Sequence, residues 1–412
     1  MTSPTPLRVA IDARLSRSGH GGGVQQVVEG LATGLLQLEP GPEEYHFIGL
    51  PGTEAWLARY MSGPCTLHVA PRPSPLAKLA RSVAKRWAKL NGRYDLPTAL
   101  SEPAPVRALG PDVVHFPLQR GFGTRRPNVY HPHDLQHRHL PDFFSARERG
   151  VRDAAYGAMC AQASVVAVTS TWVKEDVAAQ LGVPRERIAV IPLAPATDAD
   201  ARVSGDAADA LDTFALPERF VFYPAQTWPH KNHLRLLEAL ALLKREGLVV
   251  PFVSSGLKNA FHPVIARCAD ELGIADQVTF LGYVSPRALR ALYGRCTAVV
   301  IPSLFEAASF PLWEAFRAGA PAACSNVTSL PAQAGDAALV FDPQSPAAIA
   351  EAVRRLWQDD ALRANLVRRG HANVDRFTWE RTARAFRAWY RTLGGRPLSD
   401  EDRDILNAAP LL

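Results

Sequence analysis

The sequence predicts an α/β protein made of two doubly wound domains, each built on a parallel sheet. Its 412 residues, 47% of them hydrophobic and 21% charged, suffice for two hydrophobic cores. Strand-length apolar runs alternate with segments of helical periodicity, which favours parallel, Rossmann-like sheets. Pro195 to Asp212, rich in Ala, Asp and Gly, lacks periodicity and predicts a linker between the sheets. We therefore expect domains at residues 1–197 and 198–375, followed by a C-terminal helical segment at 376–412.

The first domain opens with a predicted strand, Leu7 to Asp12, that leads into a glycine-rich turn. The glycines of this turn are Gly19, Gly21, Gly22 and Gly23. A predicted helix follows from Val24 to Leu38, and Val24 occupies the last glycine position of the GxGxxG fingerprint, which argues against NAD binding. Two interpretations of the turn stay open. It is either a surface turn or a loop whose backbone approaches the phosphates of a bound substrate or a second substrate.

The other predicted strands of the first domain bring a group of histidines to one end of the sheet. These strands are Tyr45 to Leu50, Thr66 to Ala70, Asp112 to Phe116, Asn128 to His133, Ser164 to Ser170 and Ile188 to Ala194. Four of the twelve histidines fall within nine residues, namely His131, His133, His137 and His139. A metal site is one interpretation, but no helical H-x3-H pair with a set of carboxylates accompanies them, so we do not expect one.

The segment from Ala55 to Tyr94 contains eight basic residues and no Asp or Glu, whereas the net charge of the whole chain is only +6. Apolar residues recur in it at helical spacing and cations lie on another face. The two sets are Leu76, Leu79, Val83, Trp87 and Leu90, and Lys78, Arg81, Lys85 and Lys89. The segment is predicted as a basic amphipathic helix. It is either a core-packed helix with a solvated face or a surface for anionic lipid or for an anionic substrate.

In the second domain a lysine follows the first predicted strand. The strands predicted here are Phe220 to Ala225, Val250 to Ser255, Gln277 to Tyr283 and Thr297 to Ile301. Lys231 lies just before a helical segment, where an ammonium group can reach a phosphate held at neighbouring helix ends. After Pro343 the chain is predicted to be helical from Pro346 to Trp357, from Ala361 to Asn373 and again from Phe377.

The segment from Ile301 to Pro321 carries the strongest indication of chemistry. Glu306 lies in the loop after a buried strand, and Glu314 lies eight residues further on, in a predicted helix. Both carboxylates are therefore expected at the carboxyl end of a parallel strand, where ligands bind in open α/β sheets. The backbone amides of Ser309 and Phe310 lie near the N-terminus of that helix, which suits a phosphate.

These residues resemble the motifs of a known enzyme family. Glu306 and Glu314 resemble the E-x7-E signature of the family-4 retaining glycosyltransferases, and Cys324 to Pro343 resembles its continuation. The PHKN sequence that contains Lys231 resembles the donor-phosphate motif of this family, and the HDL triplet that begins at His133 resembles its catalytic-pocket segment. The resemblance implies a GT-B fold, in which two Rossmann-like domains face a cleft and a terminal helix crosses back onto the first domain.

The resemblance also implies a reaction, namely metal-independent transfer of a hexose from a nucleotide-sugar donor to a hydroxyl acceptor with retention of configuration. It implies that Glu306 orients the transferred sugar, that Lys231 holds the leaving diphosphate, and that His133 hydrogen-bonds the donor sugar. The donor-binding positions that it implies are Glu314, at the ribose, with Ser309, Phe310, Gln226, Gly22, Gly23 and Tyr283. The chain departs from the family at Gln226, where an arginine is common, and in the loop from Ala307 to Ser309, where glycines are usual.

The composition and the apolar segments indicate where the protein is located and which partners it binds. No apolar run approaches the roughly 20 residues that cross a bilayer, and MTSPTPLRVAID lacks a basic region followed by a long apolar core. Five scattered cysteines without a CxxC pair argue against disulfides and zinc. We expect a cytoplasmic protein, peripheral at the inner face of the membrane if the basic helix binds lipid. We also expect a sugar or lipid-linked acceptor, no nucleic-acid partner and no cofactor.

Two other functions stay open at this stage. One is a sugar-nucleotide epimerase or a glycoside phosphorylase on the same fold, which also needs clustered cations and carboxylates. The other is a non-catalytic protein that binds sugar nucleotides, an interpretation prompted by Gln226 and by the altered loop before Phe310. The presence of Glu306, Glu314, Lys231 and His133 together favours the transferase.

Overall fold

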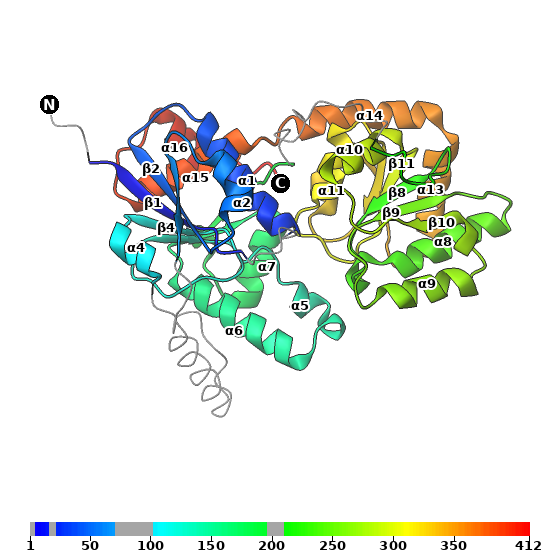
Figure 1. Ribbon diagram of the computed structural model, residues 1–412, viewed down its shortest axis with the longest axis horizontal. Coiled ribbons are helices and arrows are strands. Elements are labelled where there is room, and N and C mark those ends of the chain that lie inside the picture. The colour runs from blue at the N-terminus through cyan, green and yellow to red at the C-terminus, as the bar shows by residue number, and fades with distance from the viewer. Residues whose placement is uncertain (1–4, 16–21, 71–101, 196–209) are drawn as a thin grey trace. The chain divides into compact units, whose positions relative to one another are not determined.

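The structure is a computed structural model that describes residues 5–15, 22–70, 102–195 and 210–412 (Figure 1). The chain forms two compact units, one from residues 1–194 with 378–412 and one from residues 195–377. Each unit contains its own parallel sheet, which confirms the predicted fold class. Gly19, Gly21 and the predicted basic helix from Pro71 onward lie outside the described residues.

The sheet of the first unit has seven strands in the order β3-β2-β1-β4-β5-β6-β7, with every neighbouring pair parallel. The strands are β1 (Leu7–Asp12), β2 (Glu43–Gly49), β3 (Cys65–Val69), β4 (Val113–Phe116), β5 (Asn128–Tyr130), β6 (Val165–Val168) and β7 (Ile188–Val190). The strand order reverses between β1 and β4. The carboxyl ends of these two strands therefore flank the switch point of the sheet, where ligands bind in this architecture.

Strand β5 ends at Tyr130 and not at His133 as predicted. Pro132 has no N–H to donate to a strand ladder. His133 adopts a φ of 62°, in the left-handed region, which a strand cannot accommodate. The chain therefore leaves the sheet just before His133.

Helix α1 (Gly22–Gln37) begins earlier than predicted, so Gly22 and Gly23 form its first turn and do not belong to the preceding loop. The other helices and 3₁₀ turns of the unit before its last strand are α2 (Glu54–Leu57), η1 (Ala58–Tyr60), α4 (Ala104–Leu109), α5 (Gln136–His139), η3 (Pro141–Phe143), α6 (Ala146–Gln162), α7 (Thr171–Leu181) and η4 (Arg185–Arg187). Two more helices come from the C-terminal segment, α15 (Trp379–Leu393) and α16 (Asp400–Asn407).

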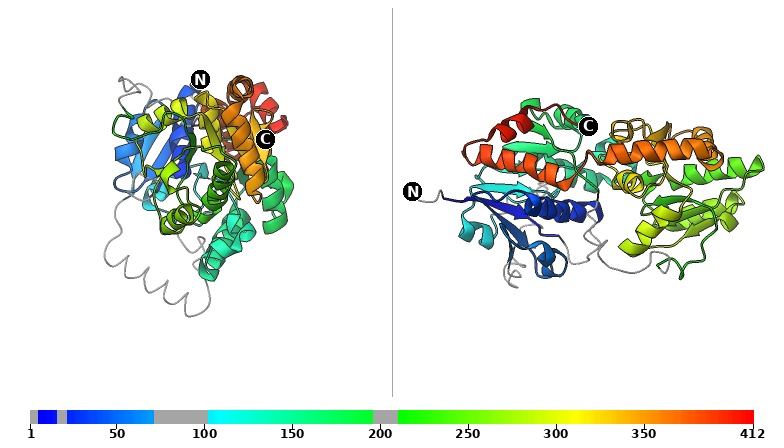
Figure 2. Two further views of the ribbon diagram at one scale, coloured as in Figure 1. Left: turned by 90° about the vertical axis from the view of Figure 1, so that its right-hand side faces the viewer. Right: turned by 90° about the horizontal axis from the view of Figure 1, so that it is seen from above.

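Helix α15 packs directly on α1, and Figure 2 shows the two helices side by side. The contact is close because α1 has glycines one turn apart on this face. A Cβ atom at Gly30 would lie 1.9 Å from the indole of Trp379, and a Cβ atom at Gly34 would lie 2.1 Å from the Trp379 carbonyl oxygen. Side chains at these two positions would therefore force the helices apart.

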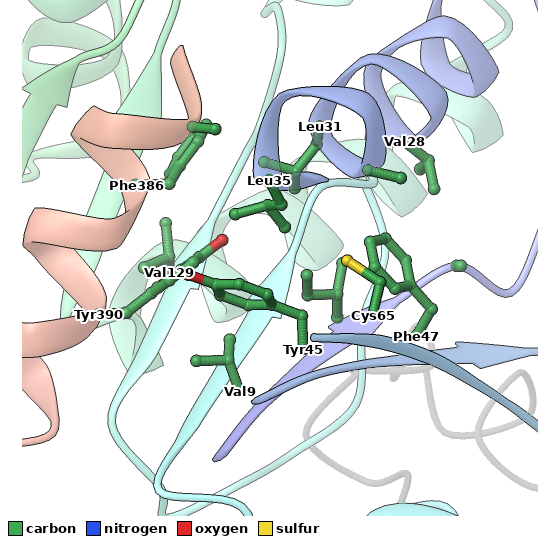
Figure 3. Close-up of a cluster of buried hydrophobic side chains, with 14 of the residues drawn as sticks. Val9, Val28, Leu31, Leu35, Tyr45, Phe47, Cys65, Val129, Phe386 and Tyr390 are labelled. Atoms are coloured by element: carbon green, nitrogen blue, oxygen red, sulfur yellow. The ribbon is translucent and has the colours of Figure 1, made fainter. Parts of the chain in front are cut away.

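The core of the first unit lies between this helix pair and the sheet (Figure 3). Phe386 and Tyr390 project from α15 toward Val129 of β5 and Tyr45 of β2 (Figure 3). These four side chains are at most 2% exposed. Because burying one large apolar side chain contributes about 1.5 to 3 kcal/mol, the C-terminal segment is an integral part of this core.

The second unit has a six-stranded parallel sheet in the order β10-β9-β8-β11-β12-β13. The strands are β8 (Val221–Pro224), β9 (Phe252–Ser255), β10 (Val278–Phe280), β11 (Ala298–Ile301), β12 (Ala322–Ser325) and β13 (Ala338–Phe341). Here the order reverses between β8 and β11. The loops that follow these two strands lie at the switch point of the second sheet.

Helices cover both faces of this sheet, with α8 and α9 on one side and α11 and α14 on the other (Figure 1). The helices and 3₁₀ turns are η6 (Pro229–Lys231), α8 (His233–Arg245), α9 (His262–Glu271), η7 (Ala275–Gln277), α10 (Pro286–Arg295), α11 (Phe310–Arg317), α12 (Leu330–Ala334), α13 (Pro346–Gln358) and α14 (Asp360–Val374). No helix in the described ranges combines the length and hydropathy of a bilayer span.

The close contact between α1 and α15 leads to a prediction about the stability of the protein. Replacing Gly34 by alanine should destabilise the protein by about 1 to 3 kcal/mol, because the added methyl group meets backbone atoms that cannot yield without moving a helix. Gly157 in α6 is the matched control, since a Cβ atom there meets nothing within 4 Å. Gly157→Ala should stabilise the helix by up to about 1 kcal/mol. Thermal unfolding measures both, and a destabilisation of the same size in the two variants would contradict the packing argument.

Candidate active site

The switch point of the second sheet brings Lys231 and Glu306 together. Lys231 ends the 3₁₀ turn η6 that follows β8, and Glu306 lies in the loop that follows β11. The Nζ atom of Lys231 lies 2.6 Å from Oε1 of Glu306, although 75 residues separate them in the chain. Their side chains are only 20% and 11% exposed. The two residues to which the resemblance assigned separate roles thus form one ion pair.

Two buried hydroxyl groups support the Glu306 carboxylate. Ser303 Oγ donates a hydrogen bond of 2.6 Å to Glu306 Oε1. The hydroxyl of Tyr223, at β8, lies 2.8 Å from Ser303 Oγ. The sequence analysis assigned no role to Ser303 or to Tyr223. The available signal was a serine directly after a buried strand and three residues before a site glutamate.

The backbone of the site is held in a strained conformation. Among the described residues, the non-glycine residues with positive φ are His133 (62°), Asn232 (60°) and Thr328 (52°). Asn232 follows Lys231, and its Nδ2 donates to the carbonyl oxygens of Pro302 and Pro343, at 2.9 Å each. Because such conformations persist only where the surroundings enforce them, the backbone beside Lys231 and the backbone at Thr328 are held in place by their neighbours in the second unit.

Thr328 fixes the backbone of Glu306. Its hydroxyl donates to the Glu306 carbonyl oxygen at 2.6 Å and accepts from the Glu306 amide at 3.1 Å. The loop after β11 is thereby tied to the loop after β12. This clamp was not predicted, since the two residues are distant in sequence.

The second glutamate of the signature is held by a buried tyrosine. Glu314 lies on α11, and its Oε2 accepts a hydrogen bond of 2.8 Å from the hydroxyl of Tyr293 on α10. Burial and the nearby Glu314 carboxylate raise the pKa of Tyr293 well above its usual range. The phenol therefore stays protonated and donates to the carboxylate.

The structure corrects the prediction for the Ser309 amide. This N–H donates to Oε1 of Gln333 at 2.9 Å, and Nε2 of Gln333 donates back to the Ser309 carbonyl oxygen at 2.6 Å. Both side chains are fully buried. In this arrangement the Ser309 amide is already paired and is not available to a phosphate. Phe310 begins α11, as expected for a residue at a helix N-terminus, and its role stays a prediction.

Gln226 and Tyr283 lie in the loops after β8 and β10. Gln226 Oε1 accepts a 2.9 Å hydrogen bond from the indole of Trp228, whose side chain is exposed. Tyr283 is 56% exposed. The two loops are joined through the loop after β9, since the Gly256 amide donates to the Gly282 carbonyl oxygen at 2.7 Å and the Thr227 amide donates to the Leu257 carbonyl oxygen at 3.3 Å. The donor-binding roles of Gln226 and Tyr283 stay predictions.

His133 belongs to the first unit, as do Gly22 and Gly23. Its Nε2 lies 2.8 Å from the carbonyl oxygen of Pro117. A carbonyl oxygen only accepts, so Nε2 carries the proton and Nδ1 is left as an acceptor. Burial lowers the pKa of His133, which keeps the ring neutral. The residue is thus suited to accept a hydrogen bond from a hydroxyl group.

The other histidines of this segment have separate partners. His131 Nε2 lies 2.8 Å from His115 Nε2 in the buried core, and burial lowers the pKa of His115 to about 3. His137 and His139 bond the carboxylates of Asp153 and Asp176. No cluster of three or more His, Cys, Asp or Glu that would suit a metal ion occurs within the described ranges.

Each of the two parallel sheets has a point where its strand order reverses, and in the second sheet a lysine and a glutamate are paired there, at the place where ligands bind in such sheets. Comparison with known families identifies the class of protein. Residues 21–194 match the model described as Glycosyltransferase Family 4, and residues 212–372 match the model described as Glycosyl transferases group 1. The chain belongs to the family-4 glycosyltransferases and is a sugar-transferring enzyme.

Curated relatives agree with this assignment. O-antigen chain mannosyltransferase B of Escherichia coli is 29% identical over 266 residues, which cover 62% of this chain and 70% of that protein. D-inositol 3-phosphate glycosyltransferase of Acidothermus cellulolyticus is 30% identical over 237 residues, covering 54% and 52%. The serotype-specific mannosyltransferase WbdA of Escherichia coli is 30% identical over 185 residues, covering 42% and 22%. The chain thus spans about half, or less, of the latter two relatives.

Solved structures show the same fold. Sucrose-phosphate synthase from Thermosynechococcus elongatus superposes with a TM-score of 0.67 at 20% identity, over 94% of this chain and 99% of that one. The Anabaena protein HepE in complex with UDP-glucose gives a TM-score of 0.67 at 18% identity, over 94% and 100%. The architecture is GT-B, with two Rossmann-like domains. These findings give no support to the epimerase, phosphorylase or binding-protein alternatives.

The clamp on Glu306 makes a second stability prediction. Thr328→Val keeps the shape of the side chain but removes both hydrogen bonds, and it should destabilise the protein by about 1 to 2 kcal/mol. Thr328→Ser keeps the hydroxyl and should stay within about 0.5 kcal/mol of the wild type. Thermal unfolding of the two variants distinguishes them. Equal stability would show that the hydroxyl does not fix this loop.

Proposed function

We propose that the chain is a retaining, metal-independent glycosyltransferase that moves a hexose from a nucleotide-sugar donor to a hydroxyl group of a glycan or glycoconjugate acceptor. The Lys231–Glu306 pair carries this proposal, because it places a cation and a carboxylate at the switch point of a Rossmann-like sheet. The central demand of the reaction is to stabilise the charge that develops on the leaving diphosphate. Preorganised donors meet that demand without reorganisation.

Lys231 supplies the cation for the diphosphate. Its ammonium group has three N–H donors, and within the described residues it donates to Glu306 Oε1. The remaining donors serve phosphate oxygens, together with the amide of Phe310 at the start of α11. In the proposal, Gln226 and Tyr283 line the nucleotide, and Gly22 and Gly23 approach the donor from the first turn of α1.

The two glutamates and His133 recognise the sugars. Glu306 accepts a hydrogen bond from the transferred hexose, and Glu314, held by Tyr293, accepts from the ribose hydroxyls. His133 accepts from a sugar hydroxyl through Nδ1, the nitrogen that its bond to Pro117 leaves unprotonated. The bond between the anomeric carbon and the diphosphate oxygen breaks, and the acceptor hydroxyl oxygen bonds to that carbon on the same face while its proton passes to the leaving diphosphate, which retains the configuration.

The relatives indicate which sugars to test. Of the three curated relatives described above, two are mannosyltransferases and one is a D-inositol 3-phosphate glycosyltransferase, and HepE was solved with UDP-glucose. Mannose is therefore the first donor sugar to test, and a sugar or lipid-linked hydroxyl is the proposed acceptor. Peripheral membrane association rests on the basic segment of Ala55 to Tyr94 alone.

The test of the proposed function is incubation with GDP-mannose, UDP-glucose and other nucleotide-sugars, with and without candidate acceptors. Slow hydrolysis of one donor, and faster turnover when an acceptor is added, is the expected result. Proton NMR of the product should show the anomeric configuration of the donor. Tight binding of a donor without any turnover would instead support the non-catalytic alternative.

Removing either member of the ion pair should lower kcat by about a hundredfold or more, since one preorganised charge stabiliser contributes roughly 3 to 4 kcal/mol to the barrier. Glu306→Ala and Lys231→Ala are the variants, and His133→Ala should be nearly as damaging. Lys244→Ala is the matched control, because Lys244 forms an ion pair with Asp276 away from the site. Wild-type rates for Glu306→Ala or Lys231→Ala would remove the central assignment.

Chelation tests the metal-independent part of the proposal. Because Lys231 provides the positive charge at the diphosphate, turnover should be unchanged after incubation with EDTA and removal of free metal ions. Activity that disappears with EDTA and returns with magnesium or manganese would contradict metal independence and leave the transferase assignment standing.

A further inference from the structure

The carboxylate of Glu306 is held at one oxygen. Oε1 accepts hydrogen bonds from Lys231 Nζ and from Ser303 Oγ, at 2.6 Å each. No hydrogen bond to Oε2 comes from the part of the chain that the structure describes. Since a carboxylate oxygen has two lone pairs, the two donors satisfy Oε1 and leave Oε2 as the acceptor for a ligand.

The direction of the hydrogen bonds behind Ser303 follows from its single proton. That proton goes to Glu306 Oε1, so Ser303 Oγ can only accept from Tyr223, whose hydroxyl lies 2.8 Å away. Burial and the nearby Glu306 carboxylate raise the pKa of Tyr223 well above its usual range. The phenol is therefore protonated. The result is a one-way chain of hydrogen bonds from Tyr223 through Ser303 to Glu306.

Tyr223 and Ser303 are buried in the second unit. Tyr223 is 1% exposed and Ser303 is 0% exposed. The ring of Tyr223 packs against His233 at a centroid distance of 5.2 Å, and its carbonyl oxygen accepts a 3.0 Å hydrogen bond from Ser254 Oγ. Because both side chains are buried, the loss of either hydroxyl leaves a buried hydrogen-bonding partner unsatisfied.

We infer that Tyr223 and Ser303 are positioning residues for Glu306, which set its Oε1 against Lys231 and present Oε2 to the transferred sugar. This inference rests on the proposed function, since it assigns the orientation of a residue at the same site. Neither hydroxyl touches the donor. Their effect on the reaction passes through the Glu306 carboxylate, where a small displacement lowers the rate without removing a charge.

The kinetic test uses Tyr223→Phe, Ser303→Ala and the double variant with the donor that supports turnover. Ser303→Ala removes a hydrogen bond to a charged group and should lower kcat by about tenfold to a hundredfold. Tyr223→Phe removes a neutral hydrogen bond and should lower kcat by about fivefold. The donor KM should change little. Because the hydrogen bonds from Tyr223 reach Glu306 only through Ser303, the double variant should be no slower than Ser303→Ala.

Tyr45→Phe is the matched control, since Tyr45 is a buried tyrosine in the core of the first unit. It should keep the wild-type kcat, and thermal unfolding should show all variants folded. Wild-type kcat in Tyr223→Phe and Ser303→Ala, or independent effects that multiply in the double variant, would overturn the inference.

A structural readout separates this inference from the proposed function. Crystal structures of the wild type and of Ser303→Ala should show the Glu306 carboxylate displaced in the variant. The distance from Lys231 Nζ to Glu306 Oε1 should exceed the 2.6 Å of the wild type. An unchanged carboxylate would refute the positioning role even in an active enzyme. A wild type that turns over no nucleotide-sugar would refute the proposed function, while displacement in the variant would still support the hydrogen-bond chain.

Discussion

The second unit depends on holding a lysine and a glutamate together, mostly out of water, where two neighbouring parallel strands end. When an ion pair is buried, both charged groups lose hydration free energy. The electrostatic attraction between them offsets this loss only where further hydrogen bonds satisfy the charged groups. The Ser303 hydroxyl provides such a bond at Glu306 Oε1. The strand order of the sheet reverses between β8 and β11. This topology makes the ion pair possible, because the loops that follow these two strands meet at one edge of the sheet although they are far apart in the chain.

The same edge of the sheet concentrates backbone strain. Asn232 and Thr328 both adopt left-handed backbone conformations, and each uses its side chain to tie the site loops to the ends of other strands. Such conformations are costly for residues with a Cβ atom, and for a β-branched residue most of all. The surrounding sheet and helices enforce them. His133 shows the same conformation in the first unit, at the point where β5 ends.

The sequence was sufficient to predict the fold class, most of the strands, and the residues whose motifs are local, such as Lys231 and Glu306. It did not reveal contacts between distant segments. Gln333 pairs with Ser309 across 24 residues, and this pairing removes an amide that the sequence offered to phosphate. Strands β12 and β13 were both missed. The sequence of β12, AACS, lacks the β-branched and aromatic residues that mark strands, and that of β13, ALVF, was considered only as part of a family motif. The glycines of α1 gave no indication of α15, because their partner, Trp379, lies at the other end of the chain.

The central claim is that the Lys231–Glu306 pair is where the donor binds. A crystal structure of the protein with the nucleotide-sugar that it turns over tests this most directly. We expect a diphosphate oxygen within hydrogen-bonding distance of Lys231 Nζ, and a hydroxyl group of the sugar hydrogen-bonded to Glu306 Oε2. A diphosphate bound away from Lys231, with the ion pair unchanged and facing no part of the donor, would contradict it.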